Sequence, residues 1–269
     1  MRKPAASQIT LRNGRISHKQ LPEINHRQYK QIYDVFRVEK GKPVFLNDHL
    51  DRLFGAIEKS GLDINFTYQE IEDKLLQLIK ESKVENGNIK IEVIFKEGYL
   101  EVLDYRASFI PTNYPDINMY ENGVDCCLFE RERKNPEIKF TNPELRKESD
   151  DLIAKRGVYE TIFHSKEIIT EGSRSNIFFI SRNELWTAPD NLVLPGTIRK
   201  KVIEIAKSIS IPLYQYPIKI NELEKMDGAF ITGTSPRVLP IRSIDDVNFK
   251  IPHPLINLII REVQRRIDD

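Results

Sequence analysis

The spacing of apolar residues predicts four helices. Over 48–60 the apolar side chains recur three or four positions apart, as they do on one face of an amphipathic helix. A second helix is predicted to start at Thr67, because Thr67 and Glu70 form the sequence pattern of a capping box. A helix with the same spacing is predicted over 198–209, and a final helix over 254–266.

Alternation of apolar and polar residues predicts strands, and turn residues between them predict hairpins. In 89–95 every second residue is apolar, as in a half-buried strand. Residues 33–38 are predicted as a strand that ends at the turn 40–43, and Asn13-Gly14 marks a hairpin. Short strands with tight turns are predicted over 159–163, 168–170, 176–180, 185–187, 213–216, 229–232 and 238–241.

This change of pattern predicts two domains. Pro111 and Pro115 interrupt both helix and strand, so the segment 111–118 is predicted to be a linker. It separates a small domain over 1–110 from a larger one over 119–269. The fold class predicted is α+β.

Composition narrows the class of protein. The 269 residues include 41 basic and 40 acidic side chains, and this balance argues against a nucleic-acid-binding protein. The longest apolar run, 258–260, is far shorter than the ~18 residues that suggest a membrane span, and no apolar stretch follows the basic N-terminus. Cys126 and Cys127 are adjacent, a spacing that suits neither a disulfide nor a metal site. A cytoplasmic protein without a metal is predicted.

Three segments carry candidate chemistry. Residues 194–197 (Leu-Pro-Gly-Thr) lead into a predicted helix with Thr197 as its expected N-cap, and such a helix start binds phosphate through free N–H groups. An ordinary capped helix is the alternative. The turn 232–236 offers further hydroxyl and N–H donors, and 170–176 places Glu171 in a turn between two strands.

Together these segments resemble the fold-type IV pyridoxal-phosphate enzymes, which include branched-chain aminotransferases, D-amino-acid aminotransferases and aminodeoxychorismate lyase. Four blocks occur in the family's order, from residue 33 to about 245. They are His49-Leu50-Asp51-Arg52-Leu53, Glu171-Gly172 with Asn176-Ile177-Phe178, Leu194-Pro195-Gly196 with Arg199, and Thr232-Gly233-Thr234 with Pro240. The resemblance implies a small N-terminal α/β domain and a larger C-terminal domain with a β-barrel-like core.

The resemblance also implies pyridoxal 5'-phosphate as cofactor and assigns residues to it. Arg52 is expected to bind the phosphate as a bidentate pair, and Glu171 to keep the pyridine nitrogen protonated. Leu194 is expected to pack behind the ring. The other cofactor-binding residues that it implies are Asn176, Gly196, Thr197, Ile198, Gly233 and Thr234.

The family needs a lysine that holds the cofactor as a Schiff base. Candidates by position are Lys134, Lys139, Lys147 and Lys155. We favour Lys139, since it stands 32 residues before Glu171, the family's usual distance, and is flanked by apolar Ile138 and Phe140. A surface lysine is the alternative.

Substrate recognition is less defined by the resemblance. Tyr33 resembles the family's active-site aromatic, and Ser235 and Arg237 are further substrate-binding candidates, with Arg174 as an alternative carboxylate partner. Ile198 stands where threonine is common, Pro236-Arg237 where Ala-Glu is common, and 96–101 lacks the usual Thr-Arg-Gly.

The leading hypothesis is an aminotransferase that moves an amino group between an amino acid, branched-chain among the candidates, and a 2-oxo acid. Aminodeoxychorismate lyase is the second hypothesis, although that branch is expected to carry threonine where Val35 stands. A non-catalytic cofactor- or phosphate-binding relative is the third. The resemblance implies a homodimer, and the apolar pairs Leu75-Leu76 and Leu78-Ile79 widen one helix face beyond a single contact. No nucleic-acid or membrane partner is expected.

Overall fold

The protein divides into two compact units in the computed structural model, which describes residues 9–26 and 28–268. The first unit comprises the described residues up to Asn113 together with Ile138–Thr141, and the second comprises Tyr114–Glu137 and the residues from Asn142 onward. The chain first crosses from one unit to the other between Asn113 and Tyr114, within the segment 111–118 that was predicted as the linker. The return of Ile138–Thr141 to the first unit has no counterpart in the sequence pattern.

The first unit is a six-stranded sheet in the order β2-β1-β6-β5-β3-β4, and every neighbouring pair is antiparallel. Its strands are β1 (Thr10–Arg12), β2 (Arg15–Ser17), β3 (Tyr29–Glu39), β4 (Lys42–Pro43), β5 (Gly87–Lys96) and β6 (Val102–Ile110), and its helices are α1 (Leu46–Lys59) and α2 (Tyr68–Ser82). The hairpin at Asn13-Gly14 and the turn after β3 are confirmed by the β1–β2 and β3–β4 pairings.

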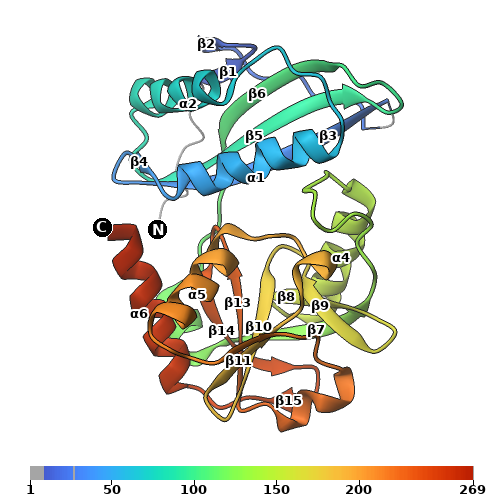
Figure 1. Cartoon of the computed structure of the whole chain (residues 1–269), viewed down its shortest axis with the longest axis vertical. Helices are drawn as coiled ribbons and strands as arrows, with labels where there is room; N and C mark the ends of the chain where they lie inside the picture. Colours follow the sequence, from blue (N-terminus) through green and yellow to red (C-terminus); the bar gives the residue numbers. More distant parts are fainter. Residues whose placement is uncertain (1–8, 27, 269) are drawn as a thin grey trace. The chain divides into compact units, whose positions relative to one another are not determined.

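Helices α1 and α2 cover one face of this sheet (Figure 1). Alternation along β3 and β5 turns residues such as Ile32, Phe36 and Ile91 toward the helices, where they are buried. The capping box is confirmed: the Thr67 hydroxyl accepts from the Glu70 N–H, and the Glu70 carboxylate accepts from the Thr67 N–H at 2.7 Å. The opposite face of the sheet carries polar side chains.

The second unit is built around a nine-stranded mixed sheet. Its strands are β7 (Val124–Glu130), β8 (Glu160–Ser165), β9 (Ile168–Gly172), β10 (Asn176–Ser181), β11 (Glu184–Thr187), β12 (Leu213–Gln215), β13 (Gly228–Gly233), β14 (Arg237–Ile244) and β15 (Val247–Asn248). Its helices are α3 (Ile117–Asn122), α4 (Pro143–Arg156), α5 (Thr197–Ser208) and α6 (Pro254–Asp268), with short 3-10 turns η1 (Asp190–Leu192) and η2 (Ile220–Lys225).

Six of these strands form a closed barrel. The order β10-β13-β14-β7-β8-β9 returns to β10 through one residue pair, Asn176 opposite Glu171. Apolar side chains such as Ile162, Ile177 and Leu239 fill the core of this unit. The β-barrel-like core expected from the family resemblance is therefore present.

Two differences from the sequence predictions have clear causes. The prediction that Thr197 is an N-cap is wrong: Gly196 is the N-cap, with no side-chain hydrogen bond, and Thr197 is the first helical residue. Helix α4 was not predicted because it has no apolar stripe, and its one buried residue is Ser149.

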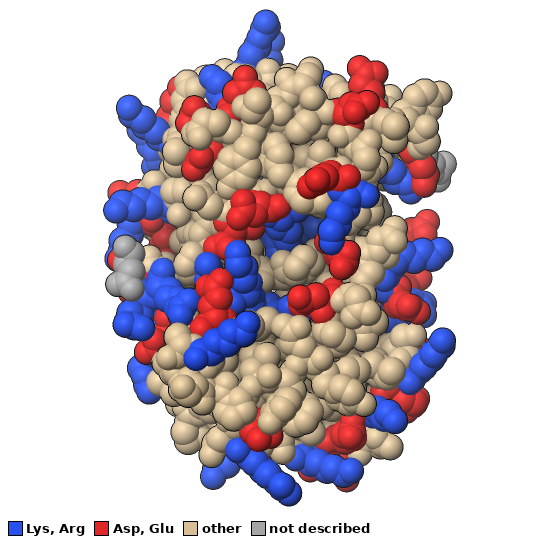
Figure 2. Space-filling view, in the orientation of Figure 1, with Lys and Arg blue, Asp and Glu red and all other residues tan. Residues whose placement is uncertain are grey.

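Basic and acidic side chains are interspersed over the face shown in Figure 2. Among the described helices, none combines the length and the apolar character that crossing a membrane requires.

Candidate active site

Lys139 lies on a short extended segment that joins the free edge of β3. The Tyr33 N–H donates to the Lys139 carbonyl, and the Thr141 N–H donates to the Gln31 carbonyl, both at 3.0 Å. This antiparallel register places Lys139 directly opposite Tyr33, so both side chains leave the same face of the sheet. The Lys139 ammonium lies 5.1 Å from the centroid of the Tyr33 ring.

The other three candidate lysines have different surroundings. Lys134, Lys147 and Lys155 are exposed, whereas Lys139 is half-buried. Ile138 and Phe140, the apolar neighbours of Lys139, pack against the core of the first unit. Of the four candidate lysines, Lys139 is therefore the one held by backbone hydrogen bonds to β3 and by neighbours that pack against the core of the first unit.

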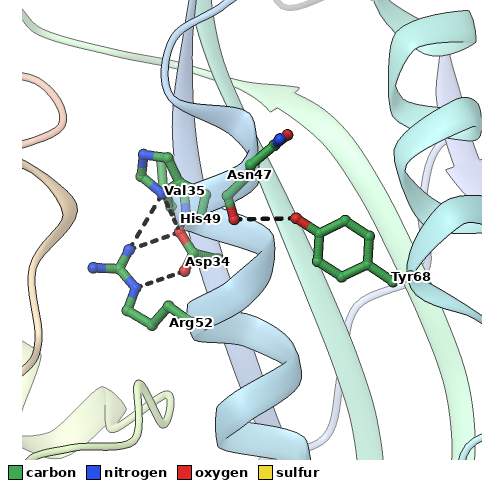
Figure 3. A network of polar contacts seen from close by, with 6 residues as sticks. All are labelled: Asp34, Val35, Asn47, His49, Arg52 and Tyr68. Atoms are coloured by element: carbon green, nitrogen blue, oxygen red, sulfur yellow. Dashed lines mark hydrogen bonds and ion pairs between the residues drawn. The ribbon is translucent and has the colours of Figure 1, made fainter.

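A buried acid–base network lies behind Tyr33, on the helix side of the sheet (Figure 3). The carboxylate of Asp34 accepts two bonds from Arg52, from Nε and from Nη2, at 2.8 Å each. It also lies 2.7 Å from Nδ1 of His49. Asp34 and His49 are almost completely buried.

The pKa directions in this network follow from its charges. Burial alone would raise the pKa of Asp34, but Arg52 and His49 outweigh it and hold that pKa well below its usual value. Burial lowers the pKa of His49, which Asp34 only partly offsets. Asp34 is therefore ionised and pairs with the Arg52 guanidinium.

This pairing changes the expectation for Arg52. The edge of the guanidinium that suits a bidentate pair binds Asp34, and Nη1 points away from it (Figure 3). Phosphate binding by Arg52 would thus use Nη1, with the orientation of the group fixed by Asp34.

In the second unit, Glu171 is a buried carboxylate at the closure of the barrel, with 2% of its surface exposed. One oxygen accepts from the Leu194 N–H at 3.0 Å and lies 3.5 Å from the amide nitrogen of Asn176. The other lies 2.8 Å from Nε of Arg133. The Glu171 carboxylate thus has two hydrogen-bond donors, the Leu194 N–H and the Asn176 amide, and an ion-pair partner in Arg133.

The start of α5 is fixed by contacts to the same residues. The Asn176 amide donates to the Leu194 carbonyl at 2.8 Å. A Cβ at Gly196 would lie 2.0 Å from Oδ1 of Asn176, so only glycine fits this close approach. Thr197 and Ile198, in the first turn of α5, are buried with their N–H groups at the positive end of the helix.

Strand β10 brings the turn between β13 and β14 close to these residues. Asn176 on β10 pairs with Thr232, which lies near the end of β13. Gly233 pairs with Arg237, and Thr234 and Ser235 lie in the turn between them. The Thr232 hydroxyl is buried and has no hydrogen-bond partner within the described part of the chain. The second unit therefore has donors and an acceptor that fit pyridoxal phosphate. They are the N–H groups of the helix start at Gly196, the buried Thr232 hydroxyl and the buried Glu171 carboxylate.

The two arginines considered for substrate binding, Arg237 and Arg174, each bind another side chain of the second unit. Arg237 binds the side chain of Gln264 on α6. Arg174 binds Asp150 at 2.8 Å, and its N–H donates to Glu160 at 2.5 Å. Arg199 is buried and ties α5 to the preceding loop through Asp190 and the Ala188 carbonyl.

A cavity of about 370 Å³ in the first unit is lined by a different set of residues. Asn13, Phe66, Lys74 and Asp104 are among its lining residues, and none of the site candidates lines it. It does not contribute to the site described above.

Sequence reasoning missed Asp34 and Arg133. Asp34 had a signal, since alternation along β3 puts it on the same face as Ile32 and Phe36, and a lone acid on an apolar face is unusual. Arg133 had none, because it lies in the run 130–134, in which every residue is charged.

The fold is that of the fold-type IV pyridoxal-phosphate enzymes. A branched-chain aminotransferase from Thermoproteus uzoniensis, solved with norvaline, matches with a TM-score of 0.83 and 21% identity over 97% of this chain and 94% of that one. A putative 4-amino-4-deoxychorismate lyase from Legionella pneumophila matches with a TM-score of 0.80 and 19% identity over 92% and 97% of the two chains. Another branched-chain aminotransferase with this fold was solved with pyridoxamine 5'-phosphate.

Sequence comparison identifies the family. The profile of the amino-transferase class IV family matches residues 31–244, so the chain belongs to that family, whose cofactor is pyridoxal 5'-phosphate. D-alanine aminotransferase from Listeria monocytogenes is 29% identical over 229 residues, which cover 80% of this chain and 78% of that protein.

Proposed function

We propose that the protein is a pyridoxal-phosphate-dependent aminotransferase that moves an amino group between an amino acid and a 2-oxo acid. The observation that carries this proposal is the placement of Lys139, a half-buried amine fixed opposite Tyr33 by sheet hydrogen bonds. A relative that bound only a phosphate group would not need an amine in this position.

Each residue then has a role that its surroundings support. When bound, pyridoxal phosphate stabilises the negative charge that develops at the substrate α-carbon. Nζ of Lys139 binds the cofactor and carries the proton to and from that carbon. The Glu171 carboxylate stabilises positive charge at the pyridine nitrogen, and Asn176 and Leu194 hold Glu171 in place.

The phosphate is assigned to donors of two kinds. Backbone N–H groups at Thr197, Ile198 and Thr234 bind it at the start of α5 and at the β13–β14 turn. Gly196 and Gly233 keep these approaches clear of side chains. The family resemblance assigns Arg52 to the phosphate as well.

The choice of donor follows the relatives. Those compared by sequence are D-alanine aminotransferases, so D-alanine with 2-oxoglutarate is the first pair to assay, followed by branched-chain L-amino acids. The purified protein, loaded with pyridoxal phosphate, is expected to form pyruvate from D-alanine only when a 2-oxo acid is present. The Lys139→Ala variant serves as control. Absence of amino transfer across a panel of D- and L-donors would contradict the proposal.

The lyase remains a second candidate because of the structural likeness to the Legionella protein. Val35, in place of the threonine expected for that branch, counts against it. Release of pyruvate from aminodeoxychorismate without any 2-oxo acid acceptor would reverse the choice.

We propose a homodimer as the working form. Support comes from the β5–β6 hairpin of the first unit, where Tyr99, Leu100 and Leu103 are 58%, 60% and 49% exposed. The stripe on α2 gives less support than expected, since only Leu76 of its four residues is exposed. Sedimentation equilibrium should give twice the 31.4 kDa chain mass, and a single-chain mass would contradict the dimer.

The cytoplasm is proposed as the location. The two cysteines, Cys126 and Cys127, are free and buried, and unpaired thiols are usual in a reducing compartment. Cell fractionation with an antibody against the chain tests this.

A further inference from the structure

The face of the first-unit sheet opposite to α1 and α2 carries a row of polar side chains in direct register. Lys139 lies opposite Tyr33, Tyr33 opposite Glu92, Glu92 opposite Arg106, and Arg106 opposite Arg12. Residues directly opposite one another on one face are close enough to interact. The row therefore links the candidate catalytic lysine to a set of charges further along the sheet.

Lys90 on β5 reaches this row from the side. Its Nζ lies 2.6 Å from Oε1 of Glu92 and 4.9 Å from the centroid of the Tyr33 ring. Nζ of Lys139 lies 5.1 Å from the same centroid. Two ammonium groups therefore flank one aromatic ring, an arrangement in which each contributes cation–π attraction but the two cations repel.

Glu92 does not need Lys90 as its partner. Its second oxygen accepts from Nε of Arg106 at 3.0 Å, and both of these side chains are 9% exposed. Arg106 is further anchored by donating to the Pro22 carbonyl. A buried ion pair is thus complete without Lys90, whose side chain is 26% exposed.

The row around Tyr33 is mostly basic. Lys90, Lys139 and Arg106 belong to it, and among the described residues Glu92 is the one acidic residue in register with them. An ammonium has three N–H donors, and Glu92 takes one from Lys90. A basic row with a half-buried ammonium at Lys90 suits an anion beside Lys139.

We propose that Lys90 binds a carboxylate group of the amino-acid substrate next to Lys139, and is a specificity-determining residue. This inference rests on the proposed aminotransferase function. It gives substrate binding to a lysine on β5 rather than to Arg237 or Arg174, which bind Gln264 and Asp150. The carboxylate is either the α-carboxylate, which every donor has, or the side-chain carboxylate of an acidic donor.

The test compares three variants of the cofactor-loaded protein. Lys90→Met removes the charge at similar length, and Lys90→Arg keeps it. Lys96→Met is the matched control, because Lys96 lies on the same strand and also stacks on a tyrosine, 4.6 Å from the ring of Tyr99. KM and kcat are measured with alanine and with glutamate as donors, together with the cofactor absorbance.

Loss of one charge-assisted hydrogen bond is expected to raise KM in Lys90→Met about 10- to 100-fold, with kcat and cofactor content little changed. Lys90→Arg should restore most of the loss, and Lys96→Met should match the wild type. A rise with both donors assigns the α-carboxylate, and a rise with glutamate alone assigns the side-chain carboxylate. An unchanged KM in Lys90→Met, or an equal rise in Lys96→Met, would overturn the inference.

A binding measurement separates this inference from the proposed function. Glutarate and propionate are titrated calorimetrically into the cofactor-loaded wild type and the same variants, without turnover. Weaker binding in Lys90→Met supports the inference even if the wild type transfers no amino group. Equal binding in Lys90→Met and the wild type would contradict it even if the enzyme is an active aminotransferase.

Discussion

Arg52 is bound to Asp34 through Nε and Nη2, so the orientation of a candidate phosphate-binding residue is set by an acid on the neighbouring strand. The pair is buried and His49 completes it. Because burial makes an unpaired charge costly, the geometry of this buried network depends on Asp34, His49 and Arg52 together.

Asp34→Asn should destabilise the protein by about 3–5 kcal/mol, because it leaves the Arg52 guanidinium buried without its counter-charge. The pKa of Asp34 is lowered in the folded state, so its stabilisation is present above the unfolded pKa of about 4 and is lost as pH falls toward the folded value. Urea unfolding between pH 3 and 7 measures both effects. The control is Asp51→Asn, an exposed acid on α1. Equal stability of the two variants would contradict this role.

Arg52→Ala should weaken the affinity for pyridoxal phosphate by about 10- to 100-fold, since a charge-assisted contact is stronger than a neutral hydrogen bond. Absorbance titration of the cofactor-free protein measures the affinity, and Lys59→Ala, at the C-terminal end of α1, is the control. An unchanged affinity would place the phosphate away from Arg52.

Lys139→Ala should abolish turnover, because it removes both the amine that holds the cofactor and the carrier of the proton. Circular dichroism should show an intact fold, since the hydrogen bonds of this segment to β3 use its backbone. Exposed Lys134→Ala is the control. Activity in Lys139→Ala, with loss in the control, would move the assignment to Lys134.

Glu171→Gln should retain the cofactor but lower kcat about 100-fold or more, because a neutral amide no longer favours a protonated pyridine ring. Stopped-flow absorbance with a saturating donor follows the rate. The control is Glu132→Gln, an exposed acid in the loop of Arg133. An undiminished rate would make Glu171 a structural residue that pairs with Arg133.

Glu160→Gln should stabilise the protein at pH values above the raised pKa of Glu160, where the wild type buries a charged carboxylate. Burial raises the pKa of Glu160, although the Arg174 N–H opposes the rise, so the stability of the wild type falls as pH increases through that raised pKa. Thermal unfolding between pH 5 and 9 should show a flatter pH profile for Glu160→Gln than for the wild type. Exposed Glu167→Gln should keep the wild-type profile, and identical profiles for all three proteins would reject the explanation.

Elements with a strong apolar period were predictable from the sequence. Helices α1, α2, α5 and α6 and strand β5 were each found close to the predicted bounds. Helix α4 was not, because its stability comes from an Asn142 cap and a proline start rather than from an apolar face. The pairing of 138–141 with β3 was invisible as well, since a contact between residues a hundred positions apart leaves no local pattern.

The candidate site shows the same division between local and long-range signals. Glycine and proline before α5 indicated a helix start, but whether Thr197 or Gly196 is the cap depended on the Asn176 side chain from another strand. Likewise, Glu171 was found from a motif, whereas its partner Arg133 lies on a segment whose charge pattern is typical of a solvent-exposed loop.

Closure of the barrel through the single pair Asn176–Glu171 has a consequence for its motions. A seam joined at one residue pair has few hydrogen bonds to break, so β9 and β10 should separate locally at lower free energy than the other strands of the ring. Of the two residues at the seam, Glu171 is proposed to contact the cofactor and Asn176 to hold Glu171 in place. The Gly172 N–H donates to the Ser175 carbonyl at this seam, so hydrogen exchange of the Gly172 amide should slow when the cofactor is bound and speed up when it is lost.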